Sequence, residues 1–213
     1  MNLKPKKQQL LNLLPNALVQ THGPHLGNTR YLTFDDGPDP EHTPPLLDLL
    51  AAHGVHASFF LVGQKVERHP ELVRRIVAEG HAIGNHSYSH WEFKNMTLRK
   101  QLSEIHHTDT LLRAFDQQAH HWVRTPRGYL AAPLLLYFAS HRRRLVHWSY
   151  DSLDYQPHPV ETLIERLRQQ PPVAGDIVLM HDDSDKARAA LSVLLPEWLA
   201  GGHAFHALPS DAA

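Results

Sequence analysis

The fold of this chain is decided by residues 31–38, which read Tyr-Leu-Thr-Phe-Asp-Asp-Gly-Pro. The first four residues predict a strand, and Gly37-Pro38 is a turn pair through which a strand cannot continue. Asp35 and Asp36 are therefore expected at the end of a strand. Because adjacent carboxylates repel each other, a cation or a basic side chain beside them favours their ionised form. The other interpretation is an acidic turn before a helix, since Asp and Gly are common turn residues.

Strand and helix patterns alternate outward from this stretch along the whole chain. Strands are expected near Tyr31–Phe34, Ala57–Val62, His81–Gly84, His121–Arg124, Leu145–Trp148, Ile177–Met180 and Ala204–Ala207. Helices are expected over Pro44–His53, Pro70–Glu79, Leu98–Phe115, Val160–Gln169 and Ala187–Leu199, with Thr43 as an N-cap and Gly54 and Gly80 as stops. This alternation predicts parallel strands joined by right-handed crossovers, and about seven units suit a distorted (β/α)7 barrel. A doubly wound open sheet is the alternative.

Composition places the chain among ordinary globular proteins. Its 213 residues are 42% hydrophobic, which is enough for one well-buried core, and no repeat or Gly/Ser-rich linker divides them. The 21 basic residues nearly balance the 22 acidic ones without a dense basic stripe, so nucleic acid is not an expected partner. The chain has no cysteine, and a metal ion would therefore have to be held by His, Asp or Glu.

Residues 1–28 are expected to form a leader ahead of a domain at 29–213. Asn12 and Pro15 interrupt the apolar stretch that follows the N-terminal lysines, so neither a secretory core nor a membrane span is predicted. This favours the cytoplasm or the inner face of a membrane as the location. One helical stripe in the leader is expected to pack on the domain, with a weak interfacial anchor as the alternative; it consists of Leu10, Leu14, Ala17 and Leu18.

A second polar cluster follows the third expected strand, where His86 and His90 stand four positions apart. Among 19 histidines such a pair arises readily by chance, but this pair and the two aspartates both lie just after strands, where a barrel gathers its functional loops. Two imidazoles and the Asp36 carboxylate would make a three-ligand site with an open position, which is typical of a catalytic metal centre. Later strand ends carry further polar residues, in Arg124–Gly128, Asp151–Tyr155 and Leu179–Asp182. Each segment alone is explained by surface cations, turns or caps.

Taken in order, these segments resemble the five motifs of the polysaccharide deacetylase family, which has a NodB-type homology domain and is also called carbohydrate esterase family 4. The resemblance runs from about Tyr31 to Leu208 and makes 29–213 the catalytic domain. It implies a metal-dependent hydrolase that removes acetyl groups, N-acetyl in preference to O-acetyl, from a carbohydrate or glycoconjugate. The implied cofactor is one divalent ion, with zinc expected and cobalt, nickel, manganese or iron as alternatives.

The resemblance also implies a role for each matching residue. Three positions match the metal ligands, namely Asp36, His86 and His90. Four match proton-transfer residues, namely the general base Asp35, Arg124 that orients it, the general acid His181 and Asp151 that tunes the acid. Leu179, two residues before His181 and on the same side of its strand, is expected to line a small pocket for the acetyl methyl group. Two further positions are expected near the substrate, namely Arg127 and Tyr155. The family often has an aromatic residue at the first of these and a tryptophan at the second.

Two other functions remain open at this point. One is hydrolysis of a non-sugar amide or cyclic imide within the same superfamily, whose members often depart from the motif set. The other is a non-catalytic sugar-binding barrel, which predicts loss of a metal ligand or of the acid. The cation at Arg127 further suggests a preference for substrates that carry a carboxylate or phosphate.

Overall fold

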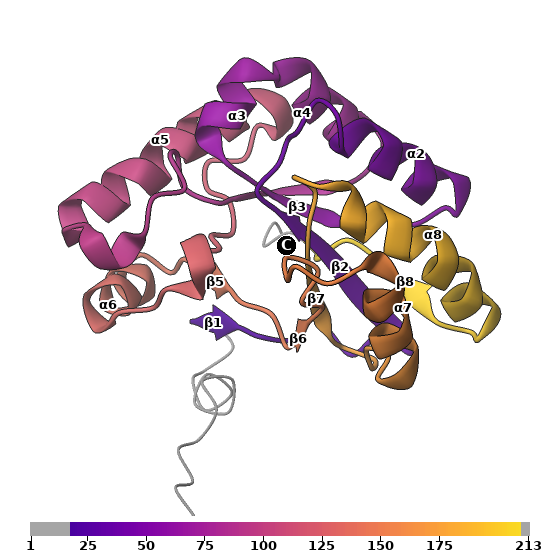
Figure 1. Ribbon diagram of the computed structural model, residues 1–213. Coiled ribbons are helices and arrows are strands. Elements are labelled where there is room, and N and C mark those ends of the chain that lie inside the picture. The colour runs from indigo at the N-terminus through magenta and orange to yellow at the C-terminus, as the bar shows by residue number, and fades with distance from the viewer. Residues whose placement is uncertain (1–17, 210–213) are drawn as a thin grey trace, which may run out of the picture.

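The strand predicted from residues 31–34 lies at the centre of the sheet. In the computed structural model, which describes residues 18–209, it extends over β2 (Thr29–Asp35), and every residue of it is buried. A strand that is buried along its whole length is typical of a parallel sheet covered by helices. Figure 1 shows β2 crossing the middle of the molecule, with the helices arranged around the outside of the sheet.

The remaining strands pair with β2 or with one another, all in parallel. They are β1 (Val19–Gln20), β3 (Ser58–Leu61), β4 (Ala82–Asn85), β5 (Leu145–Val146), β6 (Tyr150–Asp151), β7 (Ile177–His181) and β8 (Ala204–Phe205). The order is β4-β3-β2-β7-β6, β8 pairs with one end of β2, and β1 pairs with β5. The expected α/β fold with mostly parallel strands is confirmed. Within residues 18–209, isolated bridges link the two groups of strands: Val123 bridges to Asn85 at the end of β4 and to Leu145 in β5, and His22, after β1, bridges to Asp176, which precedes β7.

Helices connect the strands and bury the apolar faces of the sheet. They are α2 (Thr43–Ala52), α3 (Gly63–Arg68), α4 (Pro70–Ala78), α5 (Leu98–Asp116), α6 (Ala132–Ser140), α7 (Val160–Gln169) and α8 (Asp185–Ala200), together with the short 3₁₀ helices η1 (Phe93–Asn95) and η2 (Pro126–Gly128). Prolines occupy the first turn of α2, α4 and α6, where their missing N–H has no helical partner to lose. Gly54 and Gly80 follow α2 and α4 with φ of 62° and 83°, which confirms them as stops.

Several expected elements differ from those observed. The strand at His121–Arg124 is wrong, since only Val123 forms isolated bridges there, to Asn85 and to Leu145. Thr43 is not an N-cap but the first residue of α2, and its hydroxyl instead donates to Asp182. The strand expected at 145–148 is shorter, and β1, β6, α3 and α6 were not predicted. Strands of two residues are too short to leave a recognisable alternation in the sequence.

The N-terminal part of the described chain belongs to the sheet. β1 pairs with β5, although it lies within residues 1–28, which were expected to form a leader. The domain boundary at residue 28 stays a prediction. Most of the apolar stripe, from Leu10 to Ala17, lies outside the described residues. Between residues 18 and 209, no helix is long and apolar enough to cross a membrane.

The strand register gathers the carboxyl ends of the central strands at one edge. Asp35 is the register partner of His181 on β7 and of Phe60 on β3. One residue further along β3, Leu61 pairs with Asn85, which directly precedes His86. Asn85 also bridges to Val123, which directly precedes Arg124. The backbone therefore brings the expected site residues together before any side-chain contact is considered.

Candidate active site

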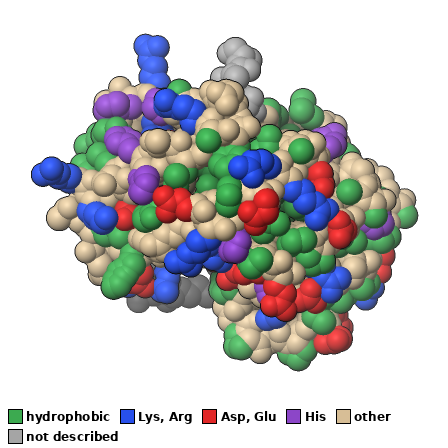
Figure 2. Space-filling view, turned by 90° about the horizontal axis from the view of Figure 1, so that it is seen from above, with side chains coloured by type: hydrophobic (Ala, Val, Ile, Leu, Met, Phe, Trp, Pro, Cys, Tyr) green, Lys and Arg blue, Asp and Glu red, His purple; other side chains and the backbone are tan. Residues whose placement is uncertain are grey.

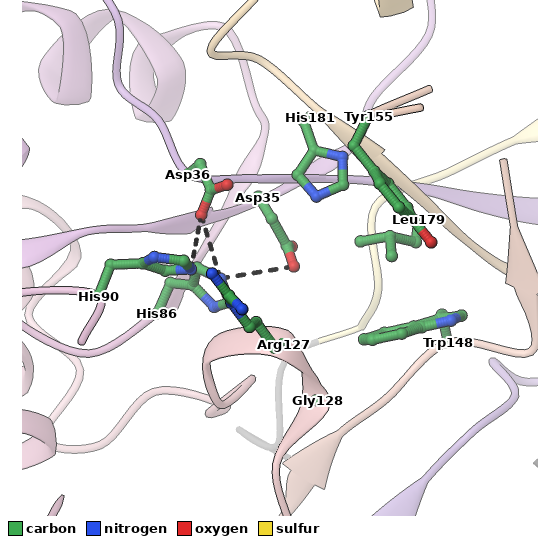
Figure 3. A pocket seen from close by; sticks show the side chains of 10 residues that line it. All are labelled: Asp35, Asp36, His86, His90, Arg127, Gly128, Trp148, Tyr155, Leu179 and His181. Carbon is green, nitrogen blue, oxygen red and sulfur yellow. Dashed lines mark ion pairs between the residues drawn. The ribbon is translucent and has the colours of Figure 1, made fainter. Parts of the chain in front are cut away.

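Asp36, His86 and His90 converge on one point, as the sequence predicted. Asp36 Oδ1 lies 3.3 Å from His86 Nε2 and 3.1 Å from His90 Nε2. One potential ligand atom from each of the three residues lies within 4.8 Å of the other two. Among residues 18–209, this is the only group of three such side chains that could hold a metal ion. The dashed lines in Figure 3 join these three side chains at one side of the pocket.

The donor atoms of this group suit a cation. His86 Nδ1 lies 2.7 Å from the Arg124 carbonyl oxygen, which can only accept, so Nδ1 carries a proton and Nε2 is the ring atom turned toward Asp36. Asp36 Oδ1 is buried and accepts no hydrogen bond within residues 18–209. Burial lowers the pKa of His86, but the Asp35 and Asp36 carboxylates outweigh burial and raise it, so positive charge is favoured between Nε2 and Asp36. Two imidazole nitrogens and a carboxylate oxygen fit a zinc-type ion with one position left open.

Asp35 lies beside this group and is held by a buried arginine. Arg124 Nη1 donates to Asp35 Oδ1 at 2.6 Å and to Thr33 Oγ1 at 2.8 Å. The guanidinium is almost fully buried, and its Cζ lies 4.0 Å from the centre of the Phe60 ring. The other carboxylate oxygen, Oδ2, faces the group and lies 3.7 Å from His86 Nε2. Arg124 thus occupies one oxygen of Asp35 and leaves the other turned toward the pocket.

His181 stands across the pocket from the two histidines, with its ring pointing inward (Figure 3). Its Nδ1 donates to Asp154 Oδ1 at 2.8 Å, while its backbone N–H donates to Asp154 Oδ2 at 2.7 Å. Burial lowers the pKa of His181, but the Asp154 carboxylate outweighs burial and raises it to about 9. The ring is therefore protonated at neutral pH, as a proton donor must be.

Asp154, and not Asp151, is the carboxylate that contacts His181. The sequence interpretation, which assigned the tuning of the acid to Asp151, is corrected on this point. Asp151 instead accepts from the Leu153 N–H at 3.0 Å and from the Tyr155 hydroxyl at 3.3 Å. Tyr155 in turn places its ring edge against His181, with centroids 5.5 Å apart. Asp151 ends β6, and Asp154 lies three positions later in the loop that follows. Their spacing in the sequence does not indicate which carboxylate turns toward His181.

A pocket of about 480 Å³ joins these groups. Its lining contains nearly all of the residues predicted for the site, together with Gly128 and Trp148 (Figure 3): Asp35, Asp36, His86, His90, Arg127, Tyr155, Leu179 and His181. Trp148 was missed as a lining residue, although an aromatic residue at the end of an expected strand was a signal for it. Thr33, which accepts a hydrogen bond from Arg124, and Asp154, which accepts one from His181, both lie inside the quoted segments. Nothing in the sequence marked these two contacts.

Arg127 lies at the mouth of the pocket and is already paired. Its φ of 54° turns the loop so that the side chain reaches Glu92, with Nη1 and Oε1 2.5 Å apart. Glu92 also pairs with Lys94 at 2.9 Å, and the Arg127 side chain is 73% exposed. Much of the positive charge expected here is therefore balanced by Glu92. In the same loop, the Gly128 N–H donates to the Thr125 carbonyl oxygen at 2.8 Å.

Fold and site together define a class of α/β proteins that gather one carboxylate and two imidazoles, a donor set suited to a cation, at the carboxyl edge of a parallel sheet. The sequence profile of the polysaccharide deacetylase family matches residues 22–146. The chain belongs to this family, as the motifs suggested, and its structural relatives are NodB-like deacetylases of carbohydrate esterase family 4.

Individual relatives resemble most of the chain. It is 33% identical over 192 residues to a peptidoglycan-N-acetylglucosamine deacetylase of Bacillus cereus, covering 88% of this chain and 70% of that protein. It is 33% identical over 219 residues to a chitooligosaccharide deacetylase of Bradyrhizobium sp., covering 94% and 99%. Among solved structures, the Bc1960 peptidoglycan N-acetylglucosamine deacetylase superimposes with a TM-score of 0.83 and 32% identity, covering 90% of this chain and 91% of that one.

Proposed function

We propose that this protein is a metal-dependent carbohydrate deacetylase that hydrolyses N-acetyl groups. The observation that carries the proposal is the placement of Asp35 and His181 on paired strands, on either side of a pocket that also contains Asp36, His86 and His90. A carboxylate base and a protonated histidine facing a common space suit hydrolysis of an acyl bond. The named activities of the similar proteins support the substrate class, an acetylated amino sugar.

Asp35 is proposed to accept the proton of the attacking water through Oδ2. Arg124 fixes the other oxygen by a hydrogen bond, so Oδ2 is left turned toward the histidines and the pocket. A divalent cation held by Asp36, His86 and His90 would supply a Lewis acid that polarises the acyl oxygen and makes water easier to deprotonate.

His181 is proposed to complete the reaction by giving its Nε2 proton to the departing amine nitrogen as the C–N bond breaks. Nδ1 remains hydrogen-bonded to Asp154, which orients the ring and stabilises its charged form. Leu179, two residues earlier on β7, lines the same pocket and offers an apolar wall to the acetyl methyl group. Tyr155 and Trp148 supply aromatic surface for a sugar ring.

The two alternatives predict different site compositions. A non-catalytic sugar-binding barrel would be favoured by loss of a ligand or of the acid, and the chain retains all three ligands, the base and His181. Hydrolases of cyclic imides or other non-sugar amides often depart from the motif set, whereas this chain keeps the base, the three ligands and the acid, and their substrates would differ in what fills the pocket. Substrate assays therefore decide between the sugar and non-sugar alternatives.

The test is an acetate-release assay of the zinc-loaded protein. The panel contains N-acetylglucosamine oligomers, peptidoglycan fragments and O-acetylated xylan, with hydrolysis of cyclic imides followed in parallel. We expect release from the N-acetylated sugars, its loss with a chelator, and no release by Asp36→Ala. Hydrolysis of imides alone would support the second function, and zinc-independent binding of sugar without hydrolysis would support the third.

A further inference from the structure

The loop that carries both histidine ligands is conformationally strained. Ser87 and His90 have φ of 65° and 56°, in the left-handed region that favours glycine. A non-glycine residue in this region costs about 1–2 kcal/mol. Such a backbone persists only where its surroundings hold it in place, and it is found at functional sites more often than elsewhere. Something outside the loop must therefore fix residues 86–90.

A buried carboxylate from α5 holds one end of this loop. Glu104 Oε2 accepts both from the Ser89 N–H and from the Ser89 hydroxyl, each at 2.7 Å. Glu104 is 3% exposed, and its other oxygen lies 2.9 Å from Lys100 Nζ. Hydrogen bonds to an ionised acceptor are roughly twice as strong as neutral ones. Since Ser89 directly precedes His90, these two bonds fix the backbone from which that ligand extends.

The other end of the loop is held by Asn85, again through α5. The Asn85 side-chain oxygen accepts from the Ser87 N–H at 2.9 Å. Its amide nitrogen donates to the Ile105 carbonyl and to Asp109 Oδ1, each at 2.8 Å. Helix α5 therefore supports the loop directly at Ser89 and, through Asn85, at Ser87. Glu104 contacts the loop directly and offers a carboxylate, whereas the second contact passes through the neutral side chain of Asn85.

We propose that Glu104 is a positioning residue, which holds the loop 86–90 so that the imidazoles of His86 and His90 face the same ion as Asp36. The role rests on the proposed metal site but not on the identity of the substrate. Glu104 lies 14 residues beyond His90 in the sequence and is neither one of the three proposed ligands nor one of the residues that line the pocket. Loss of such an outer partner of a metal site typically weakens metal affinity about 10–100-fold.

The test measures zinc affinity by competition with a chromophoric chelator, alongside the absorption spectrum of the cobalt-loaded protein. Glu104→Ala is expected to weaken zinc binding about 10–100-fold and to alter the cobalt spectrum. Glu104→Gln, which keeps a neutral acceptor, should fall between Ala and the wild type. The matched control is Gln101→Leu, because Gln101 is also buried in α5 but donates to the Phe93 and Met96 carbonyls outside the loop. Its zinc affinity should stay within about twofold of the wild type, whatever stability it loses.

The outcomes separate this role from the proposed function. Zinc binding by Glu104→Ala within about twofold of the wild type would overturn the positioning role, as would equal losses in Glu104→Ala and Gln101→Leu. Should Glu104→Ala not fold, the same comparison is made with Glu104→Gln and Ser89→Ala, which removes only the hydroxyl donor. A wild-type protein that binds zinc but releases no acetate would contradict the proposed function and leave the role of Glu104 intact. A wild-type protein that binds no zinc would contradict both.

Discussion

Asp35 has two oxygens with different surroundings, and this difference sets its proposed role. One oxygen is fixed by the buried Arg124 guanidinium, and the other faces the histidines. Asp36, one residue later, turns away from the strand with φ of 77° and reaches the histidines directly. Adjacent carboxylates are thus separated by backbone geometry into a base and a ligand.

Replacing Asp35 by Asn should remove catalysis while keeping the metal. We expect Asp35→Asn to lower kcat/KM for acetate release about 10²–10⁴-fold, because the water loses its proton acceptor. Zinc affinity should change far less than in Asp36→Asn, which loses a ligand. Circular dichroism must accompany the assay, since the exchange leaves Arg124 buried without its charge partner, at a cost of about 3–5 kcal/mol. Unchanged kcat/KM in a folded Asp35→Asn protein would rule out its role as the base.

The alkaline limb of the pH profile should report His181. Its pKa is raised, so the acid is present at low pH and is lost as the pH rises from the usual value of 6.5 toward about 9. A bound cation would offset the part of this rise in pKa that comes from Asp35 and Asp36. The alkaline limb of the metal-loaded enzyme is therefore expected between pH 6.5 and about 9. Asp154→Asn should move the limb down by about one unit or more, whereas Asp151→Asn should leave it in place. The reverse pattern would reassign the tuning role to Asp151.

The charge of Arg127 should depend on Glu92. We expect Glu92→Gln to release the guanidinium and raise the ratio of kcat/KM for anionic over neutral acetylated sugars about 2–5-fold, the range of an exposed ion pair. The double variant Glu92→Gln with Arg127→Ala should lose that gain. If Glu92→Gln leaves the ratio unchanged, the pair does not restrain Arg127. This revises the simpler expectation of a free cation at the mouth of the pocket.

At the scale of elements, a buried acid joins β7 to the start of α2. Asp182 follows His181, and its Oδ2 accepts from the Thr43 hydroxyl at 2.6 Å. Its Oδ1 is buried without a hydrogen bond among the described residues. Burial raises the pKa of Asp182 to about 7, and the Thr43 hydroxyl only partly offsets it. Gly37 packs so closely here that an added Cβ would lie 2.2 Å from Asp182 Oδ2.

This acid should make the stability of the fold depend on pH. Because its folded pKa lies above the unfolded value of 3.8, its favourable contribution is complete below that pH and is lost as the pH rises through about 7. Asp182→Asn should therefore have a higher Tm than the wild type at pH 8, by about 2–4 °C for each kcal/mol, and the gain should shrink toward pH 5. Thermal unfolding in a chelator measures this, with surface Asp185→Asn as the control. A gain of equal size at both pH values would contradict the assignment.

The sequence predicted long elements and motif positions well, because an apolar run such as β2 and a capped helix such as α5 leave clear periodic signals. It could not predict contacts that depend on how a loop turns. Asp151 and Asp154 looked equivalent, and the structure pairs Asp154 with His181. Glu104 looked like an ordinary helical acid, since nothing local indicates that α5 passes beside residues 86–90. Arg127 looked like a free cation because Glu92 is distant in the sequence.

At the scale of the whole molecule, the residues of the site and those of the main apolar core are separate sets. Buried apolar residues from β2, β3, β7 and the helices form the main cluster, which contains none of the residues that line the pocket. On the face shown in Figure 2, basic and acidic side chains are interspersed, consistent with a net charge of -1. Folding is therefore expected to depend on this core, and catalysis on the ion.

Removing the metal should abolish activity without unfolding the protein. We expect chelation to stop acetate release and to leave the far-ultraviolet circular dichroism unchanged, with zinc restoring activity. Zinc at about 100 times its Kd should stabilise the fold by about 2.7 kcal/mol, or about 5–10 °C in Tm. Asp36→Ala should show no such zinc-dependent rise. Loss of the circular dichroism signal on chelation would mean that the ion is needed for folding.

The pairing of β2 with β7 has a consequence for engineering this scaffold. Asp35 and His181 are register partners, so main-chain hydrogen bonds between neighbouring strands set their spacing. Arg127, Trp148 and Tyr155 lie instead on connections outside those strands. Grafting such connections from another deacetylase should exchange the sugar that is accepted while the spacing of base and acid is inherited unchanged.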